Sequence, residues 1–82
     1  MKIKPVVVEF VVKGSGAKEF VMGTSLSEIL EDEKTGKTFG AEYTSYTVIS
    51  LEEAKHHNLH YFNDSYDAVV RGSRSYWIGS LQ

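Results

Sequence analysis

The sequence contains no cysteine, a single proline and no long apolar run, and each shortage excludes a class of protein. Without cysteine the chain has no disulfide framework, no thiol nucleophile and no cysteine-based zinc site. No segment approaches the roughly 20 apolar residues of a membrane-spanning helix. The apolar run near the start is short, contains Glu9 and lacks a small-residue cleavage site, so no signal peptide is predicted. A cytoplasmic location without membrane contact is the default expectation.

A surplus of basic charge is also missing, because the formal net charge is −2. Residues 1–18 carry four lysines against one glutamate, whereas residues 19–33 carry five acidic residues and no basic one. This balance gives no general attraction to nucleic acid. Glu31, Asp32 and Glu33 fit a solvated helix face, and the alternative is an acidic patch for a basic partner or a nucleic-acid-binding surface.

Length and composition predict one small folded domain. The 82 residues are 41% hydrophobic and include five tyrosines, four phenylalanines and one tryptophan, which favours a folded chain. At this size a single core is only marginally sufficient. No internal repeat, low-complexity segment or linker divides the chain, so residues 1–82 are expected to form one compact α+β domain.

The first two apolar runs predict a β-hairpin over residues 6–12 and 20–22, with glycines between them for a tight reversal. Since a strand and not a helix follows, the segment Gly14-Ser15-Gly16 is not expected to bind phosphate. Alternation along the first strand predicts an apolar core face and a second face that is solvated or lightly covered. The core face holds Val6, Val8, Phe10 and Val12, and the second face holds Val7, Glu9 and Val11.

Two capping boxes predict the helices. Ser25 with Glu28 opens a helix over residues 26–34, and Ser50 with Glu53 opens a thinly apolar, largely exposed helix over residues 51–57. Asn58 is expected to end the second helix in a left-handed conformation.

The remaining segments are predicted to be strands and turns. Residues 43–49 have the β-branched and aromatic content of a third strand. A turn is expected at residues 63–65, and a second hairpin is expected to join residues 68–70 to residues 76–78 through a tip at residues 71–75. The predicted order is ββαβαββ, an α+β domain with a four- to five-stranded antiparallel sheet and two short helices.

Three histidines give the best metal candidate in the sequence. On a continuing helix, Glu53 and His57 lie one turn apart, as do His56 and His60, which is a spacing that can chelate zinc. Asn58 is expected to end that helix, however, and no second ligand cluster is evident. We therefore expect no metal and no cofactor, and treat the histidines as surface residues that complement the helix dipole or make a partner contact pH-sensitive.

Catalytic patterns are also absent from the sequence. No Gly-x-Ser-x-Gly segment is present, and the histidines gather on one surface element. Residues 63–67 resemble a calcium loop but lack its central glycine and terminal glutamate. A domain of this size has little room for a deep pocket, so no enzymatic activity is expected.

These observations favour a non-catalytic module that binds a protein partner, such as a regulator or inhibitor of a larger protein of the viral or bacterial type. Tyr and Trp carry binding energy at interfaces, and strand edges at residues 5–12 or 76–81 offer pairing sites for a partner or for a second copy in a homodimer. The candidate partner-binding residues are Tyr43, Tyr46, Tyr66, Arg71, Arg74, Tyr76, Trp77, Glu31, Asp32 and Glu33.

Nucleic-acid binding is the alternative function. Arg71 and Arg74 on the predicted hairpin, next to Tyr76 and Trp77, combine cations with aromatic rings, which are the ingredients for gripping phosphates and stacking bases. With only two arginines and a negative net charge, nucleic acid is the less favoured partner.

Overall fold

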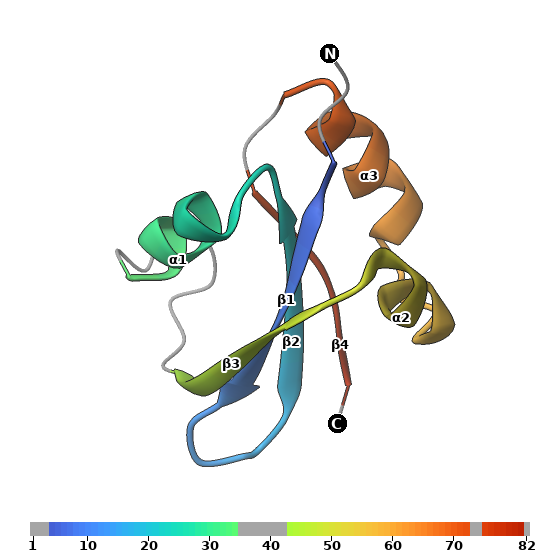
Figure 1. The fold of residues 1–82 in the computed structure, drawn as a ribbon. Helices are drawn as coiled ribbons and strands as arrows, with labels where there is room; N and C mark the ends of the chain where they lie inside the picture. The colour runs from blue at the N-terminus through green and yellow to red at the C-terminus, as the bar shows by residue number, and fades with distance from the viewer. Residues whose placement is uncertain (1–3, 35–42, 73–74, 82) are drawn as a thin grey trace.

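The computed structural model describes residues 4–34, 43–72 and 75–81, without the side chains of residues 32–34. These residues form a four-stranded antiparallel sheet with short helices (Figure 1). In chain order the elements are β1 (Val6–Val12), β2 (Lys18–Gly23), α1 (Leu26–Lys34), β3 (Tyr43–Ile49), α2 (Leu51–His56), α3 (Phe62–Val70) and β4 (Tyr76–Leu81). The order ββαβααβ confirms the predicted α+β class. No helix in the described ranges is long and apolar enough to cross a bilayer.

The strands follow the order β3-β1-β2-β4, so β1 and β2 lie in the centre and β3 and β4 form the two edges. The predicted β1–β2 hairpin is confirmed, with Val6 opposite Gly23 and Val11 opposite Lys18. Its turn places both glycines at positive φ, 92° at Gly14 and 73° at Gly16, where a side chain would be strained. A strand edge was predicted at residues 5–12, and this is wrong because β1 is paired on both sides.

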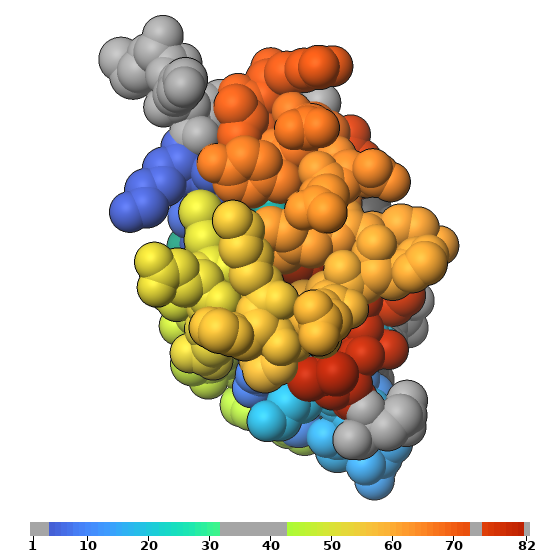
Figure 2. All heavy atoms as spheres, turned by 90° about the vertical axis from the view of Figure 1, so that its right-hand side faces the viewer, coloured from blue at the N-terminus to red at the C-terminus, as the bar shows by residue number. Residues whose placement is uncertain are grey.

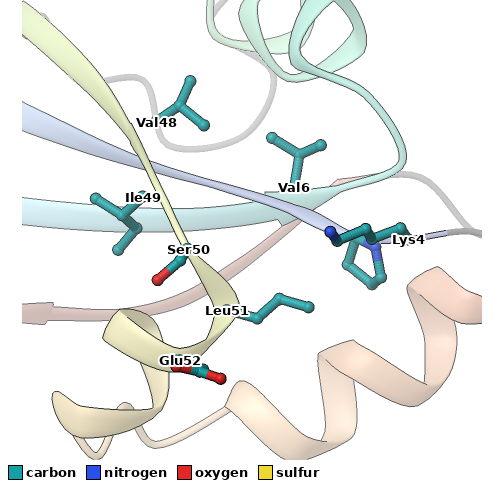
Figure 3. A pocket seen from close by; sticks show the side chains of 8 residues that line it. Lys4, Val6, Val48, Ile49, Ser50, Leu51 and Glu52 are labelled. Atoms are coloured by element: carbon teal, nitrogen blue, oxygen red, sulfur yellow. The ribbon is translucent and has the colours of Figure 1, made fainter.

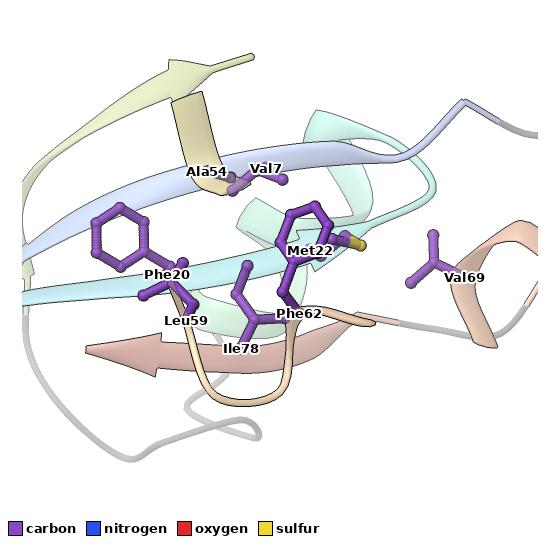
Figure 4. Close-up of a cluster of buried hydrophobic side chains, with 8 residues drawn as sticks. All are labelled: Val7, Phe20, Met22, Ala54, Leu59, Phe62, Val69 and Ile78. Atoms are coloured by element: carbon purple, nitrogen blue, oxygen red, sulfur yellow. The ribbon is translucent and has the colours of Figure 1, made fainter. Parts of the chain in front are cut away.

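Helices cover both faces of the sheet, with α1 on one side and α2 and α3 on the other (Figure 1). The smaller core cluster, Val8, Phe10, Val21 and Ile29, lies under α1. The larger cluster lies under α2 and α3 and contains Val7, Phe20, Met22, Ala54, Leu59, Phe62, Val69 and Ile78 (Figure 4). The expectation that the Val7 face of β1 is solvated or lightly covered is therefore wrong, since Val7 is completely buried.

The main difference from the prediction is a third helix in place of the second hairpin. Residues 63–65 and 68–70, predicted as a turn and a strand, all belong to α3. The helix buries Phe62, Ser65 and Val69, which recur at helical spacing and seal one face of the sheet. This burial outweighs the low helix propensity of its Asn, Asp and Val residues. Gly72, at φ 95°, ends the helix through a bond from its N–H to the Val69 carbonyl.

The first two helices begin as the capping boxes predict. Ser25 Oγ accepts the Glu28 N–H at 3.2 Å, and Ser50 Oγ accepts the Glu53 N–H at 3.0 Å. Asn58 adopts the predicted left-handed conformation, with φ 52°. Apart from Ala54, which is buried, the second helix is largely exposed, as predicted.

Candidate functional site

The edge strand β3 is the most open regular element of the described chain. Residues 44–48 are all exposed, and only the end residues, Tyr43 and Ile49, are half-buried. The strand pairs with β1 on its inner side, and none of the described residues pairs with its outer side. An unpaired strand edge presents a row of backbone donors and acceptors that can template pairing with another chain.

The sequence of β3 lacks the residue types that usually protect a strand edge. Protective features include lysine, other charged side chains, proline, bulges and covering loops. Residues 43–49 contain no charge, no proline and no glycine. The pairing of β1 with β3 shifts its register once, between Val11 and Val12 of β1. This shift lies opposite the start of β3, and the pairing along the remainder of β3 is regular.

The opposite edge, β4, is protected. Its pairing with β2 shifts between Phe20 and Val21, and Gly79 adopts φ 150°. The segment before α3 lies over this strand, because the Tyr61 N–H donates to the Ile78 carbonyl at 3.1 Å and Leu59 packs closely against Gly79. Among the described residues, therefore, a segment outside the sheet bonds to β4, whereas none pairs with the outer side of β3.

An apolar recess of about 530 Å³ adjoins the C-terminal end of β3 (Figure 3). We call it the β3 recess; it is lined by Lys4, Pro5, Val6, Val48, Ile49, Ser50, Leu51 and Glu52. Val6 and Val48 project from adjacent strands to the same side of the sheet, and Leu51 extends toward Lys4 (Figure 3). Val48, which lines the recess, keeps 49% of its surface exposed.

Two tyrosines of β3 belong to this surface. The ring of Tyr43 stacks on the ring of Phe10 with centroids 4.6 Å apart. The centroid of the Tyr46 ring lies 6.1 Å from that of Phe10. Tyr46 remains 49% exposed. Tyr46 and Val48 face the same side of the sheet, since their β1 partners are Phe10 and Val8. The exposed apolar surface therefore runs along β3 toward the β3 recess.

The other predicted aromatic residues lie elsewhere. Tyr66 is exposed on α3, and Tyr76 is exposed at the start of β4. Trp77 is half-buried, and its Nε1 donates to Glu19 Oε2 at 2.7 Å. The ring centroids of Tyr61 and Trp77 lie 5.7 Å apart, and both residues line a shallow recess on the α3 side. Figure 2 shows the α2–α3 face, with the red end of β4 beside the two helices.

The predicted cationic hairpin is not formed, because Arg71 is the C-cap of α3 and follows a helix. Arg74 lies outside the described residues, as do the side chains of Asp32 and Glu33, while Glu31 is exposed on α1. The indole N–H of Trp77 donates to Glu19, and the ring of Trp77 lies 5.7 Å from the ring of Tyr61 between centroids.

One group of possible metal ligands does converge. Glu53 and His57, the pair noted in the sequence, meet Glu9 of β1, and their ligand atoms lie within 4.8 Å of one another. His56 and His60 are exposed and lie outside this group. The sequence predicted that Glu9 lies on a solvated or lightly covered face and did not predict its contact with Glu53 and His57. The available signal was a single charged residue in the middle of an apolar strand.

Comparisons of the chain with protein-family models, with curated proteins and with solved structures return no match. The function therefore has to be inferred from the surface itself.

Proposed function

We propose that the protein is a non-catalytic binding module that takes up an extended segment of a partner protein as an additional strand beside β3. The observation that carries this proposal is the outer edge of β3, which is uncharged and pairs with none of the described residues. Binding of this kind suits a regulator or inhibitor of a larger protein.

Two features of β3 suit the addition of a partner strand: its outer backbone groups, unpaired among the described residues, and the adjacent apolar recess. An added strand satisfies the open backbone groups of the edge, and pockets for alternate side chains provide specificity. Here the β3 recess lies beside Val48 and is largely apolar, so it fits an apolar side chain of the incoming strand. Lys4 and Glu52 at the recess provide one positive and one negative group for polar contacts at the rim.

A partner segment fits this surface better than a second copy paired symmetrically about Tyr46, the middle residue of β3. In that pairing Thr44 of the second copy lies opposite Val48, and Tyr43 lies opposite Ile49. Thr44 is too short to fill the recess, and the ring of Tyr43 is already stacked on Phe10. A foreign segment can instead place a large apolar residue there.

Selection from a displayed library of random peptides tests the proposal, with the immobilised full chain as bait and sedimentation of the free protein as a companion measurement. We expect the enriched peptides to alternate apolar and polar residues, as strands do, and the free chain to sediment as a monomer. Enrichment of unpatterned basic peptides would place binding on an acidic surface and contradict the proposal. A dimer that a charge on β3 dissociates would assign β3 to a second copy and equally contradict it.

A further inference from the structure

A second site lies on the other face of the sheet, where β1 meets α2. We infer that Glu9, Glu53 and His57 form a binding site for a divalent transition-metal ion of the zinc type. This Glu9–Glu53–His57 cluster is independent of strand addition at β3, because it consists of other side chains and faces α2.

The cluster joins two elements that are distant in sequence. Glu53 lies in the first turn of α2 and His57 is its C-cap, so the two are four residues apart and lie on the same side of the helix. Glu9 comes from the central strand β1, on the face that α2 covers. The three ligand atoms lie within 4.8 Å of one another. Zinc holds such atoms at about 2 Å, or about 3.4 Å from each other, so small side-chain rotations complete the site.

The imidazole of His57 provides an independent sign of a missing ligand. Its Nε2 is buried and has no hydrogen-bond partner among the described residues. A buried nitrogen without a partner costs free energy, and such an atom in a native fold requires an explanation. The ring packs against Phe20, with centroids 5.1 Å apart, so its position is constrained before any ion arrives. Coordination of a metal ion by His57 supplies a use for a buried imidazole nitrogen held in this way.

The ligand types select the class of metal. Two carboxylates and one imidazole suit zinc and neighbouring divalent ions, and their two negative charges match the charge of the ion. Calcium requires six to eight oxygen ligands, and magnesium also prefers oxygen ligands, so the imidazole of His57 disfavours both ions. Three protein ligands leave one tetrahedral position for water. The existing contact from Lys18 Nζ to Glu9 Oε1 is long, at 3.7 Å, and Lys18 is half exposed, so an ion can displace it.

The test is calorimetric titration of the untagged full chain with Zn²⁺, beside the variants Glu53→Gln and Glu52→Gln. Both residues are exposed neighbours on the same helix, so neither variant disturbs the core, but only Glu53 belongs to the cluster. We expect one ion per chain, binding at least about tenfold weaker in Glu53→Gln and unchanged in Glu52→Gln. The wild-type melting temperature should rise with Zn²⁺ but not with Mg²⁺ or Ca²⁺.

Two further variants locate the ion. Glu9→Gln should weaken binding as Glu53→Gln does, because it removes the ligand on β1. His56→Gln, which replaces an exposed histidine outside the cluster, should leave binding unchanged. Equal affinity in the wild type, Glu9→Gln and Glu53→Gln would overturn the site. So would the absence of Zn²⁺ binding to the wild type, or its loss in His56→Gln.

Discussion

Replacing Val48 with lysine is expected to lower the affinity for a library-selected peptide at least about tenfold, because an added strand would bury the new charge beside the β3 recess. Lysine on an edge strand is also one of the natural devices against strand pairing. The fold should survive the change, because Val48 is 49% exposed and belongs to neither core cluster. Fluorescence anisotropy of the labelled peptide measures the loss.

The matched control is Ser80→Lys, which puts the same charge on an exposed position of the opposite edge strand. It should bind the peptide as the wild type does, because the bulge and the segment before α3 already close that edge. Circular dichroism of both variants verifies that the fold is kept. Equal loss of affinity in the two variants, or no loss in Val48→Lys, would show that the peptide does not pair with β3.

Replacing Phe20 with alanine is expected to cost about 3–5 kcal/mol of the free energy of unfolding. Phe20 is among the largest fully buried side chains and contributes to the cluster between the sheet and the two C-terminal helices. Domains are typically stable by about 5–15 kcal/mol, and a chain of 82 residues is expected near the lower end, so this loss should remove much of the stability. Urea denaturation followed by the fluorescence of Trp77, the single tryptophan, measures the change.

Tyr76→Ala is the control for this variant, since it removes a large aromatic side chain that is 40% exposed. It should cost about 1 kcal/mol or less, in the range of surface substitutions. A similar loss in Tyr76→Ala and Phe20→Ala would mean that the larger cluster does not dominate stability.

Local signals in the sequence were sufficient for much of the fold. The glycines at 14 and 16 specify the β1–β2 turn, and the serines at 25 and 50 specify where two helices begin. Each of these features depends on residues within a few positions of one another. The third strand was also predicted with its observed bounds, residues 43–49, because its β-branched and aromatic content is continuous.

The segment that became α3 could not be assigned from local preference. Asn63 and Asp64 favour a turn, and Val69 and Val70 favour a strand, yet Phe62 and Val69 are buried together against the sheet. Tertiary burial decided the conformation, as it often does for short segments of weak propensity. The only local hint was the helical spacing of the buried positions.

The β3 edge and the Glu9–Glu53–His57 cluster depend on how strands and helices distant in sequence are arranged, which limited what the sequence could predict about them. Sequence reasoning identified strand edges as pairing sites but placed one of them on β1, which is central. It identified the spacing of Glu53 and His57 but not Glu9, which reaches them only because β1 passes beneath α2. Strand order and helix placement decide both points, and neither is encoded in a local pattern.

Hydrogen exchange of the β3 backbone amides, measured by NMR with and without a library-selected peptide, tests strand addition most directly. In the free protein, the amides on the outer side of residues 43–49 should exchange quickly, because no described strand protects them. Peptide binding should slow those amides at least about tenfold and leave the amides of β4 unchanged. Protection that appears on β4 or α3 instead, while the β3 amides keep their free exchange rates, would contradict strand addition at β3.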